Sequence, residues 1–107
     1  MKLVRDNIPT IILENQSNCA YAECKDSELL RRLLENKLFE EAKEFIEEYS
    51  IAEAADILTV LYYLYNTNKE NTGKIYDFDA FLEDLKIAFL RKLDTNGGFS
   101  KGYNIFY

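Results

Sequence analysis

The sequence predicts an all-α fold, an antiparallel helical bundle of three main helices with a short N-terminal helix. Apolar residues recur every three or four positions over long stretches, which is the spacing of one face of an α-helix. One proline and four glycines are the only strong helix breakers among the 107 residues. Capping residues precede each long stretch. The length fits one domain over residues 1–107, and the 48% hydrophobic content can form a core.

The first half of the chain predicts a short helix followed by a long one. Pro9 favours the first turn of a helix, so we expect a helix over about Ile8 to Glu14. Asp26 or Ser27 can cap the next helix, which runs from Glu28 to about Glu48. Its apolar stripe consists of Leu30, Leu34, Leu38, Ala42, Phe45 and Tyr49.

The second main helix begins at a capping box. Ser50 and Glu53 have the S-x-x-E spacing in which each side chain bonds the other residue's backbone N–H. The stretch that follows, "IAEAADILTVLYYLY", is apolar on nearly all sides and is typical of a buried core helix. The polar run "NTNKENTG", residues 66–73, predicts a loop.

The third main helix has clear start and stop signals. Asp77 or Asp79 can cap its N-terminus, and Gly97 and Gly98 are typical of a helix end. Residues 99–107 are rich in apolar and aromatic side chains, so we expect this tail to pack against the protein.

Charge and residue usage exclude several classes of function. The formal net charge of −6 disfavours general binding to nucleic acid, which is itself a polyanion. There is no apolar run of about 18 residues and no signal-peptide pattern, so we expect a cytoplasmic protein that does not insert into membranes. The chain has no histidine, which excludes Ser-His and Cys-His nucleophiles. Cys19 and Cys24 are expected to be free thiols.

Two pairs of carboxylates have the same helical spacing. Glu41 and Glu44 are three residues apart on the first long helix, and Glu53 and Asp56 repeat this spacing on the next. A tight turn near Ser50 should make the two helices antiparallel. At about 1.5 Å per residue, Glu44 and Asp56 each lie roughly 9 Å from Ser50 along their helices. The two pairs can therefore meet at one level.

Such a convergence needs a compensating charge. Two like charges about 4 Å apart repel by about 4 kcal/mol at an effective dielectric constant of 20. Oxygen ligands without His or Cys favour Mg²⁺ or Mn²⁺, which suits phosphoryl chemistry. Simpler roles for these carboxylates stay open: Glu41 and Glu44 can be solvated charges, Glu53 can serve the capping box alone, and Asp56 can pair with a basic side chain.

Four blocks of the sequence resemble one known family in the same order: "KLVRDNIPTII", "LLENKLFEEAKEF", "EAADILTVL" and "RKLDTNGGFSKGY". Together they are similar to the all-α nucleoside triphosphate pyrophosphohydrolases of the MazG type, in the small branch labelled phosphoribosyl-ATP pyrophosphohydrolase-like. The resemblance implies one MazG-like domain over residues 1–107. It also implies a Mg²⁺-dependent hydrolase that cleaves the α–β phosphoanhydride of a nucleotide, acting as a homodimer or homotetramer.

The resemblance also implies roles for particular residues. Glu41, Glu44, Glu53 and Asp56 match the metal ligands, and Glu40, with Glu41, matches the catalytic pair that orients or deprotonates the attacking water. The positions that match substrate-binding residues are Lys37, Arg5, Asp6 and Lys92. From the residues alone, Arg5 and Asp6 can equally form local pairs or caps, and Lys92 can stabilise a helix C-terminus.

Two other functions stay open. The chain has Asn7 and Asn96 where the family more often has Lys and Arg, which favours a non-catalytic protein that binds a metal or nucleotide. The apolar second helix and the aromatic tail favour a helical interaction module. Among nucleotides, both canonical and damaged (d)NTPs and phosphoribosyl-ATP are candidate substrates, with a housecleaning role one possibility.

Overall fold

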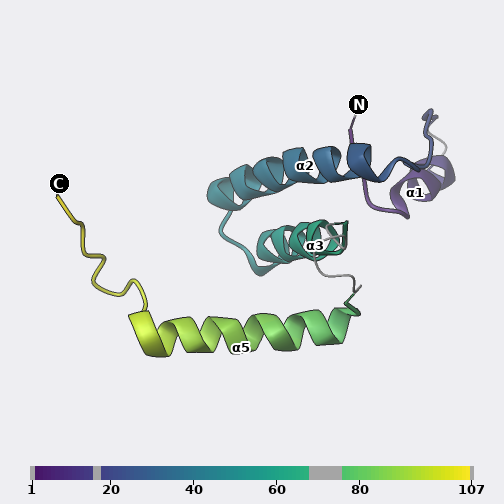
Figure 1. Ribbon diagram of the computed structural model, residues 1–107. Helices are drawn as coiled ribbons and strands as arrows, with labels where there is room; N and C mark the ends of the chain where they lie inside the picture. Colours follow the sequence, from purple (N-terminus) through teal and green to yellow (C-terminus); the bar gives the residue numbers. More distant parts are fainter. Residues whose placement is uncertain (1, 16–17, 68–75, 107) are drawn as a thin grey trace. The chain divides into compact units, whose positions relative to one another are not determined.

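The computed structural model describes residues 2–15, 18–67 and 76–106, which form four α-helices and no strand (Figure 1). The all-α prediction is therefore confirmed for this part of the chain. The chain divides into two compact units, Met1–Ile75 and Tyr76–Tyr107. Bundle packing that includes both units stays a prediction. Among the helices of the described ranges, none has the length and apolar character needed to cross a membrane.

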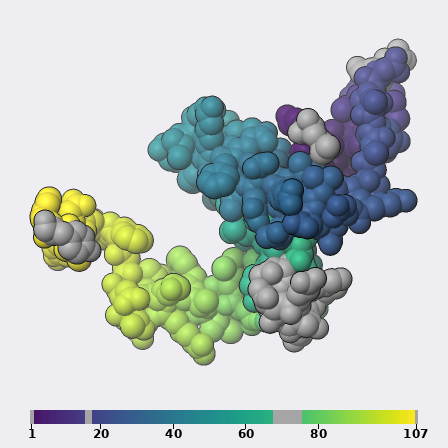
Figure 2. Space-filling view, turned by 45° about the horizontal axis from the view of Figure 1, so that its top comes forward, coloured from purple at the N-terminus to yellow at the C-terminus, as the bar shows by residue number. Residues whose placement is uncertain are grey.

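The first unit begins with the short helix α1, Ile8–Glu14, and the long helix α2, Ser27–Glu47. Pro9 lies in the first turn of α1, as its fixed φ favours. The carboxylate of Asp26 caps α2 by accepting hydrogen bonds from two backbone N–H groups of the first turn, at 3.0 and 3.3 Å. Helix α1 lies beside residues 18–25, which lead into α2 (Figure 1, Figure 2).

Helix α3, Ile51–Thr67, packs against α2 as an antiparallel hairpin (Figure 1). Leu34 of α2 and Val60 of α3 are buried at 6% exposure each and form the core of this unit. The prediction that α3 is buried on nearly all sides is wrong: among its residues, all of which the structure describes, only Val60 is buried, and Ile51 is 87% exposed. A hairpin partner covers only one face of a helix, which explains the difference.

The loop predicted over residues 66–73 is only partly described. Asn66 and Thr67 belong to the last turn of α3, where the hydroxyl of Thr67 donates a hydrogen bond to the carbonyl of Leu64 at 2.8 Å. Residues 68–73 lie outside the described ranges.

The second unit consists of helix α5, Phe78–Asn96, and the tail that follows it. The carboxylate of Asp77 caps the helix by accepting from the N–H of Ala80 at 2.8 Å, and Gly97 ends it with a φ of 79°, which favours glycine. Within this unit the tail does not pack against α5 as expected, because Phe99 is 96% exposed and the other described tail side chains are exposed too. Within this unit, one helix offers little surface to cover them.

Candidate functional site

Helix α2 brings three carboxylates together. Glu41 and Glu44 lie one turn apart on the same face, and Glu40 precedes Glu41. One oxygen from each of Glu40, Glu41 and Glu44 lies within 4.8 Å of the other two. The basic residue Lys37 lies one turn earlier on this helix, next to the group.

Helix α3 adds two carboxylates from the other arm of the hairpin. The hydroxyl of Ser50 accepts a hydrogen bond from the backbone N–H of Glu53 at 3.1 Å, which is one of the two bonds of the predicted capping box. Glu53 and Asp56 then share a face. One oxygen from each of Glu41, Glu53 and Asp56 lies within 4.8 Å of the other two. The short turn thus makes the two pairs of carboxylates meet at one level.

Glu41 is the centre of this carboxylate cluster, which we define as Glu40, Glu41, Glu44, Glu53 and Asp56. It belongs to both groups of three and is only 6% exposed. Within the described part of the chain, its Oε2 atom and Oε2 of Glu53 are buried without a hydrogen-bond partner. Burying an unpaired carboxylate oxygen is costly. Two such atoms within a set of oxygen donors fit a hard divalent cation.

Three basic side chains partly neutralise the cluster: Lys37, Arg5 and the exposed Lys2, whose Nζ lies 4.0 Å from Glu40 Oε1. Lys37 Nζ lies 3.2 Å from Glu41 Oε1 and 3.4 Å from Glu40 Oε1. Arg5 Nη2 donates to Asp56 Oδ1 at 2.6 Å and to the hydroxyl of Thr59 at 3.2 Å. The basic partner that could explain Asp56 without a metal is therefore present.

The charges that remain raise the pKa values of two carboxyl groups. A hydrogen bond with Glu41 and its charge raise the pKa of Glu44, and loss of solvent contributes. Loss of solvent, then the charges of Asp56 and Glu41, raise the pKa of Glu53. Burial lowers the pKa of Lys37, but its interactions with Glu41 and Glu40 outweigh this and leave the pKa raised. The three basic groups are thus insufficient to compensate the cluster.

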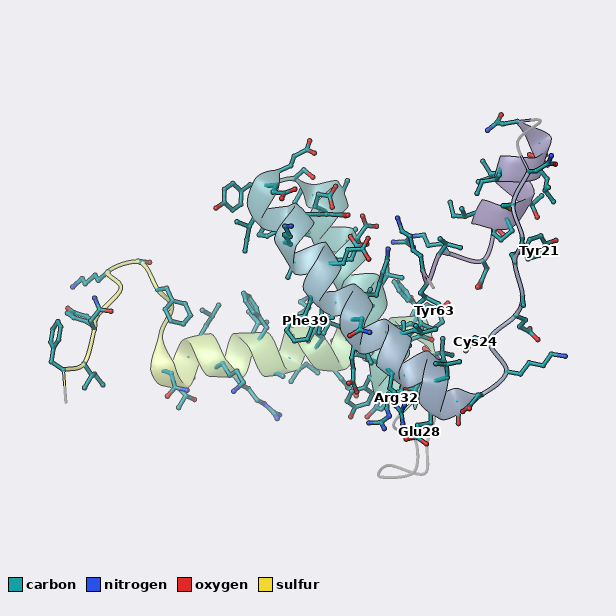
Figure 3. All side chains as sticks on the ribbon, turned by 90° about the horizontal axis from the view of Figure 1, so that it is seen from above. Tyr21, Cys24, Glu28, Arg32, Phe39 and Tyr63 are labelled. Carbon is teal, nitrogen blue, oxygen red and sulfur yellow. The ribbon has the colours of Figure 1, made fainter. Side chains whose placement is uncertain are left out.

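A cavity of about 620 Å³ opens beside the cluster in the first unit. It lies between the N-terminal segment, residues 3–8, and the α2–α3 hairpin, and Glu41 and Asp56 are part of its wall. Tyr63, labelled in Figure 3, lines it from α3. Most of the remaining wall is apolar, for example Leu34 and Val60. Pockets of roughly 300–1,000 Å³ are typical of small-ligand sites.

The structure places most of the predicted substrate-binding residues at this cavity. Arg5, Asp6 and Lys37 all line it. Lys92 lies on α5 in the second unit, so its role stays a prediction. Sequence reasoning missed Thr59 and Tyr63, which also line the cavity. They follow Asp56 by three and seven residues, and this helical spacing could have identified them.

Comparison with protein-family models, curated proteins and solved structures found no match. The resemblance to the MazG-type family therefore stays a prediction. What is established is the geometry: five carboxylates, three basic partners and an adjoining cavity.

Proposed function

We propose that this protein is a Mg²⁺-dependent nucleotide pyrophosphohydrolase of the MazG type, converting a (d)NTP or related nucleotide to a monophosphate and pyrophosphate. The observation that carries the proposal is the buried Glu41, which is shared by two groups of carboxylates and has an unpartnered oxygen. The family resemblance of the four sequence blocks supports the same function.

Glu41, Glu44, Glu53 and Asp56 would hold the cation, with Mn²⁺ as a possible substitute for Mg²⁺. All four supply carboxylate oxygens, the ligands that these metals prefer. The arrangement fits because the two unpartnered oxygens, on Glu41 and Glu53, belong to this set. A bound Mg²⁺ supplies neutralisation of phosphate charge and a lowered pKa of coordinated water.

The chain's other side chains would bind and orient the substrate. Lys37 and Arg5, which pair with carboxylates of the cluster, can turn toward phosphate oxygens when a cation compensates those carboxylates. Glu40 is only partly buried and lies next to the cluster, so it can accept a proton from the attacking water. The water oxygen bonds to phosphorus, the phosphoanhydride P–O bond breaks, and pyrophosphate leaves.

Exposed apolar residues support assembly as a homodimer or homotetramer. Ile51 and Leu61 of α3 are exposed, although the helix is apolar on nearly all sides. A second copy would bury such surface. The same observation favours a second candidate function, a helical interaction module without chemistry. A thermal melt that does not respond to Mg²⁺, Mn²⁺ or EDTA would favour this alternative.

The test is pyrophosphate release from a panel of NTPs, dNTPs and phosphoribosyl-ATP, with Mg²⁺ and with EDTA. We expect release of pyrophosphate and monophosphate in equal amounts, abolished by EDTA. Mg²⁺-dependent nucleotide binding without turnover, in a sample whose helical circular dichroism is intact, would overturn the enzymatic proposal in favour of a non-catalytic binding protein.

A further inference from the structure

The cavity and the carboxylate cluster are continuous. Glu41 and Asp56 belong to the cluster and also line the cavity, together with Lys37 and Arg5. Away from these charges the wall is mainly apolar and includes Ile11 of α1. A ligand whose charged end meets the cluster would therefore place an uncharged end in the cavity.

We propose that this cavity is a base pocket, in which Tyr63 stacks on the nucleobase and Asn7 contacts its edge. The inference rests on the proposed function, because it assumes that phosphates lie at the cluster. A nucleobase matches the cavity in chemistry, since its flat faces suit apolar and aromatic walls and its edge carries hydrogen-bonding groups. The volume of about 620 Å³ leaves room for the base and its sugar.

Tyr63 is placed for stacking. Its ring packs edge-to-face with that of Tyr62, at a centroid distance of 5.1 Å and an interplanar angle of 77°. This contact restricts the orientation of the Tyr63 ring. The side chain nevertheless remains 49% exposed and lines the cavity, so part of it is accessible to a ligand.

Asn7 is placed for contact with the edge of the base. It is the N-cap residue of α1, a position where asparagine usually bonds the helix, yet its side chain makes no cap hydrogen bond. It lines the cavity instead. A carboxamide offers both a donor and an acceptor, so it can form two hydrogen bonds with one base edge.

The test measures binding by isothermal titration calorimetry with Mg²⁺ present. The probes are a non-hydrolysable α,β-methylene ATP analogue, its UTP counterpart, inorganic tripolyphosphate, which lacks base and sugar, and adenosine, which lacks phosphate. The variants are Tyr63→Ala, Asn7→Leu and Ile11→Trp, the last of which fills the cavity. Tyr65→Ala is the matched control, an exposed tyrosine of the same helix outside the cavity wall.

We expect Tyr63→Ala to weaken binding of the ATP analogue by about fivefold to hundredfold, the range for loss of one stacked base. Tripolyphosphate binding should change less than about twofold, and Tyr65→Ala should leave both unchanged. Ile11→Trp should likewise weaken only the analogue and adenosine. Asn7→Leu should change the ratio of affinities for the ATP and UTP analogues.

Equal affinity of the wild type for tripolyphosphate and the analogues would overturn the base pocket and leave the proposed function standing. If Tyr63→Ala weakens the binding of all probes equally, the base pocket is overturned too. Adenosine binding that is lost in Tyr63→Ala, without any binding of phosphates, would support the pocket and contradict the proposed function. Failure of all four probes to bind would overturn both the base pocket and the proposed function.

Discussion

Replacing Glu41 with glutamine separates the contribution of Glu41 to stability without metal from its contribution to binding a cation. The substitution keeps the size of the side chain and removes one charge. At an effective dielectric constant of 20, the lost attraction to Lys37 at 3.2 Å is worth about 5 kcal/mol. The substitution also removes repulsion from four carboxylates, Glu40, Glu44, Glu53 and Asp56, each with an oxygen within 4.8 Å of one of Glu41, and each pair is worth about 3.5 kcal/mol or more. The lost repulsion therefore outweighs the lost attraction, so the metal-free free energy of unfolding of the variant should not fall below that of the wild type.

The response to Mg²⁺ should weaken. At a Mg²⁺ concentration of about 100 times Kd, the wild type gains about 2.7 kcal/mol, which raises Tm by about 11–22 °C in a domain of this size. If loss of one ligand weakens binding about 100-fold, the same concentration gives the variant about 0.4 kcal/mol, or roughly 2–3 °C.

Circular dichroism melts in EDTA and over a Mg²⁺ titration measure both quantities. Glu47→Gln is the matched control, because Glu47 is exposed on the same helix and outside the cluster. A Tm rise in Glu41→Gln equal to that of the wild type would refute the assignment of Glu41 as a cation ligand.

Three further predictions follow from contacts around the site and its supporting helix. Arg5→Ala should lower stability by less than about 1 kcal/mol, because the pair with Asp56 is partly exposed. The same variant should also bind Mg²⁺ more tightly in calorimetry without nucleotide, because the Arg5 guanidinium no longer competes with the cation for Asp56. Weaker Mg²⁺ binding would contradict this expectation. The raised pKa values of Glu44 and Glu53 mean that the folded state holds their protons more tightly than the unfolded state. Metal-free stability, measured by urea denaturation, should therefore fall as pH rises from the ordinary value of 4.5 through the raised values, and a rise would contradict the sign. Asp26→Ala should cost about 1 kcal/mol in the same assay by removing the cap of α2, and an unchanged midpoint would argue against the cap.

Local signals in the sequence predict the helices well. The range of α1 agrees with the expectation from Pro9, and Asp26, Asp77 and Gly97 cap or end the helices that they were expected to limit. The convergence of carboxylates also follows from local rules, because an i,i+3 spacing on each arm and a short turn fix their relative heights.

Contacts between distant residues could not be predicted in this way. Arg5 and Asp56 are 51 positions apart, and no local pattern indicates that the N-terminal segment folds back onto α3. The cavity lies between those same two segments, and Arg5 and Asp56 both line it. Burial of α3 within the first unit and of the tail within the second was overestimated, because apolar composition shows that a side chain favours burial but does not supply the surface that covers it.

The most direct measurement is the rate of pyrophosphate release at saturating Mg²⁺ for the wild type, Glu44→Gln and Glu47→Gln side by side. The carboxylate cluster predicts a loss of about a hundredfold or more for Glu44→Gln, as expected when a group that holds the catalytic ion is removed, and an unchanged rate for Glu47→Gln. Equal rates for all three proteins, or no release by a folded wild type, would contradict the cluster's role as the centre of hydrolysis.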